Sequence, residues 1–442
     1  MTNERTISGF SKMRKRDKIK WIAKNFFSDP DHVMTELVSY WHGDEQQQKI
    51  LDGFSENTIS NFPMPYGVAP NFLIDGRTYV VPMVIEESSV VAAASAAAKY
   101  WMSRGGFVTT ILDTQKVGQV HFKWTGNPEK LKGIFPEIKN LLIEESKDLT
   151  VNMENRGGGI LDIELLDFTD EVEGLYQIRA YFETCDSMGA NFVNSCLERF
   201  GATLRNYVIA SDKLEEAEKD ILIVMSILSN YTPDCIVRAM VTCPVEELGT
   251  FAGGMKASLF AEKFVTAVKI AHIDPYRATT HNKGIYNGVD AVALATGNDF
   301  RAIESCGHTY ASRDGRYRSL SFAEVNDGVF KFWIDLPLAI GTVGGLTSLH
   351  PIAKRSLELL GDPDAKTLMS IIASTGLAQN FAAIRSLVTT GIQKGHMKMH
   401  LQNILNQMKA TDEESKAALI YFTDRVVSFA GVREYLQDQR GQ

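Results

Sequence analysis

The sequence predicts a mixed α/β protein of several domains, with a ferredoxin-like domain inserted into a larger one and a helical C-terminal segment. Three observations support this. The chain has 442 residues, more than one ordinary core contains. A β-α-β-β-α-β pattern occupies 112–228, between an alanine-rich helix at 88–102 and a second mixed region. From residue 377 onward the apolar residues recur at helical spacing.

The region before the insert combines short helices, two strands and one distinctive helix. The strands are expected around FLIDG and TYVVPMVIE. The helix from Ser88 to Met102 has alanine at 92–94 and 96–98 and ends at Gly105 and Gly106. Because alanine lets neighbours approach closely, we expect this helix to be buried at the centre of the large domain.

The insert follows a regular order. GQVHFKW alternates as a strand, and 131–142 has helical spacing. ILDIELLDF and LYQIRAYFE then flank a polar turn, a helix begins near Ala190, and DILIVMS is the last strand. This order predicts the ferredoxin-like unit.

The remainder returns to mixed structure and ends in helices. We expect AVALAT and VFKFWIDLPLAI to be strands. Thr411 and Glu414 form a capping-box pattern, and Gly391 and Gly395 flank a joint that could serve as the hinge of a lid. Two apolar helical stripes are expected, at Leu377, Phe381, Ile384 and Leu387 and at Leu419, Phe422, Val426 and Phe429.

Composition and charge exclude several classes of protein. Hydrophobic residues are 44% and charged residues 23%, as in folded soluble proteins. The net charge of −8 argues against a nucleic-acid-binding surface. The basic cluster at 12–20 is either a solvated helix face or an attractor of phosphates on a small ligand.

Cysteine usage and the N-terminus predict a cytoplasmic protein. The five cysteines are an odd number without a CxxC pair, which indicates free thiols and no structural zinc site. Charges interrupt MTNERTISGF where a signal peptide would be apolar. The longest small and apolar run, 90–98, is far shorter than the roughly 20 residues that cross a bilayer.

Three ionisable segments could carry chemistry, and two of them also have a structural interpretation. Glu86 and Glu87 precede the alanine-rich helix, so one could cap it, or a buried one could donate a proton. Lys283 lies among apolar neighbours in DPYRATTHNKGIYNGVD, where an ammonium could polarise a carbonyl. Asp299, expected just past a strand, could cap the next helix or hold Lys283 charged.

His396 and His400 have the i, i+4 spacing of zinc ligands. The segment lacks the glutamate of HExxH and shows no third ligand, so we expect no metal. A single histidine on a mobile segment is better suited to moving protons. CDSMGAN (185–191) is a strand-turn-helix junction whose amides could receive a phosphate, and GTVGG (341–345) would let the backbone touch a flat cofactor.

Together these segments resemble 3-hydroxy-3-methylglutaryl-CoA reductase of the soluble microbial class (class II). They occur in the family's order between residues 56 and 397. The matching segments are ENTISNFPMPYGVAPNF, PMVIEESSVVAAAS, DSMGAN, DPYRATTHNKGI, ATGNDFRA, GTVGG with LHP after it, and LAQNFAAIRSL through GIQKGHM. Ser60 and Ser88 depart from the family's usual glycine and proline, and Ser11 or Lys12 stands where some relatives use arginine for a CoA phosphate.

The resemblance implies a role for each candidate residue. Glu87, directly before the helix, would be the catalytic acid, Lys283 would steady the oxyanion, Asp299 would tune both, and His396 would protonate the departing CoA thiolate. On the cofactor side it implies Asp186, Met188, Gly189, Asn191, Gly344 and Gly345. On the acyl side it implies Ser89, Arg277, Asn287, Gln379, Asn380 and Leu387.

The resemblance also implies the reaction, the cofactor and the assembly. (S)-3-hydroxy-3-methylglutaryl-CoA would be reduced reversibly to mevalonate and CoA by two hydride transfers from NADPH or NADH. Either Asp148 or Thr150 would neighbour the adenosine ribose, and we favour NADPH. A homodimer, or a higher assembly of dimers, with shared active sites is expected. The alternatives are a non-redox acyl-CoA lyase or transferase and a non-catalytic homologue that binds CoA or nucleotide.

Four segments of the chain are expected to correspond to these functions. Residues 1–111 and 229–388 would form the large substrate-binding domain, 112–228 the inserted cofactor-binding domain, and 389–442 the helical flap.

Overall fold

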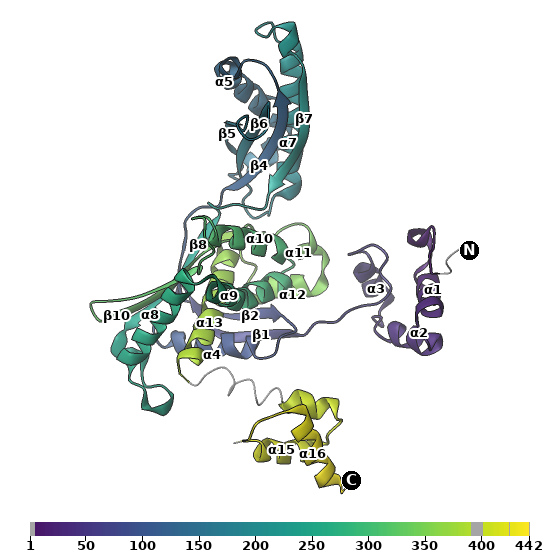
Figure 1. Cartoon of the computed structure of the whole chain (residues 1–442). Helices are drawn as coiled ribbons and strands as arrows, with labels where there is room; N and C mark the ends of the chain where they lie inside the picture. The colour runs from purple at the N-terminus through teal and green to yellow at the C-terminus, as the bar shows by residue number, and fades with distance from the viewer. Residues whose placement is uncertain (1–4, 390–400, 424, 442) are drawn as a thin grey trace.

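The computed structural model describes residues 5–389, 401–423 and 425–441 (Figure 1). The chain starts with three helices, α1 (Lys15–Phe26), α2 (Pro30–Ser39) and α3 (Glu45–Asp52). Residues 53–65 then lead to the antiparallel hairpin of β1 (Tyr66–Ile74) and β2 (Arg77–Val84). Asp75 and Gly76 both have positive φ at its turn, as a tight right-twisted hairpin requires.

The large domain packs helices against this hairpin and against a second antiparallel sheet. That sheet has the order β3-β8-β10-β9. Its strands are β3 (Val108–Ile111), β8 (Ile236–Pro244), β9 (Ser321–Asn326) and β10 (Val329–Pro337). The packed helices include α4 (Val90–Met102), α8 (Ala257–Ile273), α9 (Pro275–Ala295) and α13 (Ala365–Val388).

Helix α13 lies deepest in the large domain. It is buried at nearly every position from Leu368 to Phe381 and contacts α4, α8, α9 and β8. By length and composition α13 could also cross a membrane, but 83% of its most apolar window is buried inside the protein, as expected of a core helix. The small residues between Ala373 and Ala378 let its neighbours pack closely.

The expectation for α4 was wrong in part. The helix packs on β1 and α13 through Ala94, Ala97 and Trp101, but Ala92 and Ala96 are exposed on its other face. Small side chains permit close packing without requiring it on every side, so α13, not α4, is the enclosed helix. The glycine stop at the end of α4 is confirmed, because Gly105 and Gly106 have positive φ and the Gly106 amide bonds to the Trp101 carbonyl.

The inserted unit has the expected ferredoxin-like order. Its sheet runs β5-β6-β4-β7, with all neighbours antiparallel. Helix α7 packs on β4 and β7, and α5 packs on α7. The elements are β4 (Lys116–Trp124), α5 (Pro128–Glu144), α6 (Lys147–Glu154), β5 (Gly159–Asp167), β6 (Leu175–Glu183), α7 (Ala190–Ala210) and β7 (Ile221–Ser229). Strands β3 and β8, on either side of the insert in sequence, pair in one sheet of the large domain.

A second correction concerns 291–296. This stretch was expected to be a strand, but 291–295 is the last part of α9 and is largely buried. A continuous apolar run in a buried helix has no polar face, so its periodicity resembles that of a buried strand. VFKFWIDLP is β10, as expected.

The C-terminal half contains the shorter helices α10 (Phe300–Ala311), α11 (Leu346–Leu349), α12 (Pro351–Leu359), α15 (Asp412–Tyr421) and α16 (Phe429–Arg440). Short 3-10 turns occupy Phe10–Lys12, Glu216–Glu218, Val245–Leu248 and Ala252–Gly254. The capping box of Thr411 and Glu414 is confirmed at the start of α15. The prediction that Leu419, Phe422, Val426 and Phe429 form one helix face was wrong. Helix α15 ends before Phe422, and Val426 is 83% exposed. Gly391 and Gly395 lie outside the described residues.

Candidate active site

An ion pair joins two of the residues that the sequence singled out. The Lys283 ammonium lies 2.5 Å from Oε2 of Glu87, and the Asn287 amide donates to the same oxygen at 3.4 Å. The side chains of Glu87 and Lys283 are 38% and 58% exposed. Residues 196 positions apart in the chain therefore form one polar group that solvent and a ligand can reach.

Helix α9 positions Lys283 and Asn287 on one face. Asp274 caps the helix by accepting from the Tyr276 amide, and Pro275 occupies its first turn. Residues 283 and 287 are four apart, so both side chains reach Glu87. Lys283 and its neighbour Gly284 both lie within this helix.

Glu87 lies in the loop between β2 and α4. Ser89, with φ of 76°, occupies the N-cap position of α4, and the Glu87 carboxylate binds Lys283 and Asn287. The capping interpretation of Glu87 is therefore wrong. Glu86 beside it is exposed.

Asp299 has the structural role that the sequence left open. Its carboxylate caps α10 by accepting from the amides of Arg301 and Ala302, and it pairs with the Arg301 guanidinium at 3.0 Å. The hydrogen bond from Arg301 is the main cause of the lowered pKa of Asp299. Asp299 follows helix α9 and not a strand, and the ion pairs of the described residues join Lys283 to Glu87 and Asp299 to Arg301.

Helices α9 and α13, which carry most of the acyl-side candidates, cross closely. A Cβ on Gly288 would lie 2.8 Å from the Thr375 carbonyl oxygen, and one on Gly376 would lie 2.8 Å from the Val289 side chain. Only glycine fits at either position, so the two helix backbones nearly touch. Gln379 and Asn380 follow this crossing along α13.

The acyl-side candidates differ in how accessible they are. Gln379 and Asn380 are 6% and 1% exposed, whereas Leu387 on the last turn of α13 is 41% exposed. Arg277, on the first turn of α9, is partly buried, and desolvation lowers the pKa of its guanidinium. The Gln379 Oε1 atom is buried without a hydrogen-bond partner among the described residues.

The two cofactor-directed segments lie against each other. The Asp186 carbonyl accepts from the Thr342 amide at 2.8 Å, and its carboxylate accepts from the Ala365 amide at the start of α13. A Cβ on Gly341 would lie 2.5 Å from the Met188 nitrogen. Residues 186–188 and 341–343 thus form one backbone cradle.

The rest of this cradle leaves backbone open for a flat ligand. Gly344 and Gly345 have positive φ, and an added Cβ would meet nothing within 4 Å at either position. Gly189, also with positive φ, is the N-cap of α7, and Asn191 beside it is exposed. Free amides at the start of a 21-residue helix and an open glycine loop fit a phosphate and a planar ring.

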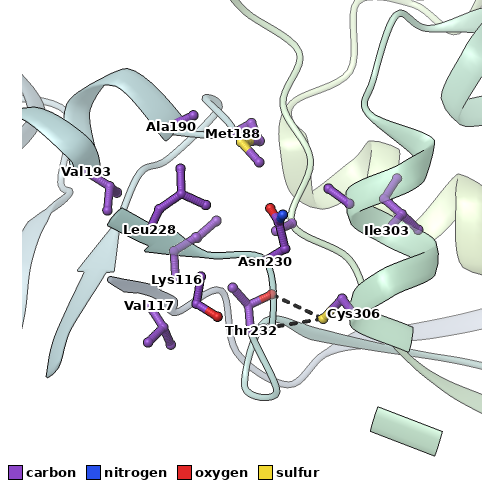
Figure 2. A pocket seen from close by; sticks show the side chains of 13 residues that line it. Lys116, Val117, Met188, Ala190, Val193, Leu228, Asn230, Thr232, Ile303 and Cys306 are labelled. Carbon is purple, nitrogen blue, oxygen red and sulfur yellow. Dashed lines mark hydrogen bonds between the residues drawn. The ribbon is translucent and has the colours of Figure 1, made fainter. Parts of the chain in front are cut away.

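A cavity beside the cradle was missed by sequence reasoning (Figure 2). Met188 and Ala190 line it from the cofactor segment, and Lys116, Asn230 and Cys306 line it from β4, the end of the insert and α10. Lys116 is 6% exposed, and burial raises the pKa of the Cys306 thiol. Because the lining comes from separate elements, no local sequence pattern marks it.

Asp148 and Thr150, the alternative ribose neighbours, both lie on α6. Thr150 is 1% exposed, and its hydroxyl bonds to the Lys147 carbonyl. The exposed Asp148 carboxylate binds Arg199 through both oxygens, at 3.1 and 3.2 Å. The hydrogen bonds from Arg199 are the main cause of the lowered pKa of Asp148.

His396 and His400 lie outside the described residues, so their predicted roles stay predictions. Among the residues that the structure describes, no group of three or more His, Cys, Asp or Glu side chains is placed to hold a metal ion. The five cysteines are all described and all are free thiols.

The family model described as hydroxymethylglutaryl-coenzyme A reductase matches residues 16–401. Among curated proteins, the 3-hydroxy-3-methylglutaryl-coenzyme A reductase of Archaeoglobus fulgidus is 35% identical over 436 residues, 98% of this chain and 94% of that protein. The probable reductase of Borreliella burgdorferi is 29% identical and covers 92% of this chain and 90% of its own length.

Solved structures give the same result. A 3-hydroxy-3-methylglutaryl-coenzyme A reductase structure from Streptococcus pneumoniae has a TM-score of 0.71 and 34% identity, covering 98% of this chain and all of that one. A second structure of the class II enzyme from that organism, described as bound to NADPH in open conformations, has a TM-score of 0.70 and 34% identity, over 92% of this chain and 98% of its own.

Proposed function

This chain belongs to the hydroxymethylglutaryl-coenzyme A reductase family, and we propose that the ion pair of Glu87 and Lys283 is its catalytic centre. The protein is an oxidoreductase that uses a nicotinamide cofactor to reduce 3-hydroxy-3-methylglutaryl-CoA to mevalonate and CoA. The observation that carries the proposal is the accessible contact between the Lys283 ammonium on α9 and the Glu87 carboxylate in the loop before α4.

Lys283 acts on the thioester carbonyl. When bound, the reduced cofactor supplies hydride, once to the thioester and once to the aldehyde that follows. Each addition places negative charge on the carbonyl oxygen, and the ammonium stabilises this charge. Glu87, bonded to Lys283, delivers the proton that completes the alcohol. Overall, two reduced cofactors and two protons convert one thioester into one alcohol and one thiol.

His396 and Asp299 complete the proposed set. The CoA sulfur leaves the carbon that accepted hydride more readily when it receives a proton, because the pKa of a thiol is about 8.5. His396 would donate that proton from the flap. Asp299, at the start of α10, would tune Lys283 and Glu87. His396→Gln should slow thioester reduction much more than reduction of the free aldehyde, and equal losses on the two substrates would remove His396 from this step.

We propose the cradle of Asp186, Met188, Gly189, Asn191, Gly344 and Gly345 as the cofactor site and NADPH as the preferred cofactor. The open glycines and the start of α7 fit a ring and a phosphate, as described above. Arg199 neutralises Asp148, the carboxylate that would repel a 2′-phosphate. A ratio of kcat/KM that favours NADH would overturn this preference.

We propose a homodimer with shared active sites, and dimers could assemble further. The arm at 53–65 is extended, Phe62 on it is 91% exposed, and Tyr276 at the start of α9 is 89% exposed. Apolar side chains as exposed as these fit a surface that a second copy covers. Sedimentation at micromolar concentration tests the proposal, and a monomer active at that concentration would reject it.

The remaining expectations extend this proposal. Ser89, Arg277, Asn287, Gln379, Asn380 and Leu387 would contact the acyl part of the substrate. Residues 1–111 and 229–388 would bind substrate, 112–228 the cofactor, and 389–442 would form the flap. We expect a cytoplasmic enzyme with no membrane, nucleic-acid or metal partner.

An absorbance assay tests the function. The protein is mixed with 3-hydroxy-3-methylglutaryl-CoA and reduced cofactor, and the absorbance of the reduced cofactor is followed at about 340 nm. We expect two cofactors to be oxidised for each mevalonate formed. No oxidation with either cofactor would reject the reductase, and release of CoA without oxidation would favour a lyase or transferase. Binding without either reaction would favour a non-catalytic homologue.

A further inference from the structure

A buried chain of hydrogen bonds leads from α9 to α13 behind the Glu87–Lys283 pair. His281 Nε2 lies 2.7 Å from the Ser321 hydroxyl, which donates to Oδ1 of Asn380 at 2.7 Å. The three residues are 1%, 0% and 1% exposed. His281 is two residues before Lys283, and Ser321 is the first residue of β9.

The direction of each bond follows from the groups present. The Asn380 Oδ1 atom can only accept, so the single Ser321 proton points toward it. The Ser321 oxygen must then accept from His281, which places the imidazole proton on Nε2. His281 Nδ1 is left buried without a partner among the described residues, so the imidazole is held at an energetic cost.

The segment that carries Ser321 is itself fixed. The Asn282 amide donates to the Arg318 carbonyl and accepts from the Leu320 amide, at 2.8 and 3.0 Å. The Ser319 hydroxyl bonds to the Ser321 backbone on both sides, at 2.8 Å to the carbonyl and 3.0 Å from the amide. Ser321 is therefore a rigid intermediate between the two helices.

Fixing Oδ1 of Asn380 also fixes where its NH₂ group points, because the planar amide has only two ends. Stability alone does not require such an arrangement, since apolar side chains could fill the same space without leaving Nδ1 unpaired. We propose that His281 and Ser321 are positioning residues that hold the Asn380 amide ready to donate to the acyl part of the substrate. This rests on the proposed acyl-side role of Asn380.

Ser321→Ala tests the relay by removing the hydroxyl alone. Without it the amide can rotate, so KM for 3-hydroxy-3-methylglutaryl-CoA should rise roughly tenfold while KM for the cofactor stays unchanged. Ser319→Ala is the graded comparison: it removes a buried hydroxyl that only braces Ser321, so the rise in KM should be clearly smaller than in Ser321→Ala. An unchanged KM for Ser321→Ala, or the same rise in both variants, would overturn the proposal.

The histidine offers an independent test if Ser321→Ala does not fold. His281→Gln keeps an N–H donor near the position of Nε2, whereas His281→Leu has similar bulk and no donor. We expect His281→Gln to retain the wild-type KM for the acyl-CoA and His281→Leu to lose about as much as Ser321→Ala. Equal values in these two variants would overturn the relay.

Calorimetric titration with 3-hydroxy-3-methylglutaryl-CoA in the absence of cofactor separates this inference from the proposed function. When Ser321→Ala is introduced into the wild-type protein, we expect it to weaken binding of the acyl-CoA. When it is introduced into Asn380→Ala, we expect no further change in affinity. An undiminished effect in that background would overturn the inference alone. A wild-type protein that oxidises no cofactor would instead reject the proposed function.

Discussion

The substrate side and the cofactor side of the site are built in different ways. On the proposed substrate side the contacts are between side chains: Lys283 of α9 pairs with Glu87 where solvent reaches both, and Asn380 of α13 accepts a buried hydrogen bond from Ser321. On the cofactor side, backbone amides and glycines of two loops form the cradle, with Gly341 against Met188. Side-chain changes should therefore damage the first side selectively, whereas a Cβ added where the two loops touch, at Gly341, should damage the second.

The largest expected effect belongs to the substrate side. Lys283→Ala removes the ammonium that stabilises the oxyanion, and kcat should fall by at least about 10²- to 10³-fold. Folding should survive because Lys283 is 58% exposed. Steady-state kinetics and circular dichroism measure the two quantities. A near-normal kcat would remove the lysine from the mechanism. It would also contradict the expectation that side-chain changes selectively damage the substrate side.

The cofactor side is broken most simply at Gly341. In Gly341→Ala the new Cβ would lie 2.5 Å from the Met188 nitrogen and 3.0 Å from the Asp186 oxygen, so the two loops must separate. We expect KM for the cofactor to rise at least about tenfold, with calorimetric affinity for the acyl-CoA unchanged.

Gly133→Ala on α5 is the control for this change. Its Cβ would meet nothing within 4 Å, and alanine favours a helix. Kinetics identical to wild type are expected. Loss of acyl-CoA affinity in Gly341→Ala would show that the two sides are not separable in this way.

The free energy of unfolding should depend on pH through His281. Burial is the main cause that lowers the pKa of His281 from 6.5 to about 3, with Arg277 and His272 adding to it. As pH falls, the unfolded chain therefore protonates His281 before the folded chain does. The contribution of the neutral imidazole to the free energy of unfolding is fully present above pH 6.5 and is lost as pH falls from 6.5 toward 3. Urea unfolding at about pH 7 and about pH 5 should show a smaller loss for His281→Gln than for wild type. Equal losses would contradict the buried neutral imidazole.

An effect of opposite sign is expected at Asp290, one turn beyond Asn287 on α9. Burial, followed by the nearby Glu304, raises the pKa of Asp290 from 3.8 to about 8. The folded chain keeps this proton longer than the unfolded chain, so the contribution is present below pH 3.8 and is lost as pH rises through about 8. Asp290→Asn should therefore gain stability relative to wild type as pH rises across this window. A constant difference would show that Asp290 ionises as freely as an exposed carboxyl.

Much of the fold follows from local patterns. The insert could be predicted because each strand alternates and each helix has an apolar face, whereas 291–296 was misread because it is apolar throughout. The burial of α13 and its crossing with α9 could not be predicted, because they depend on Gly288 meeting Thr375 and Gly376 meeting Val289 across helices that are distant in sequence.

The candidate site divides similarly. The resemblance implied that Glu87 and Lys283 serve one site, and the structure places their side chains in contact. The cavity at Lys116 and Asn230 and the relay through Ser321 carry no local signature, since each combines single residues from separate elements. For Asp299 the sequence left two interpretations open. The structure shows the capping of α10, and the contact with Lys283 stays a prediction.

The central claim is that Glu87 and Lys283 act as one catalytic unit, and a double-mutant cycle tests it most directly. The kcat values of Glu87→Gln, Lys283→Met and the double variant are compared with wild type. The account predicts that the double variant is about as slow as the slower single variant, because either change already disables the shared centre. Losses that multiply would show that the two residues work independently and would contradict it.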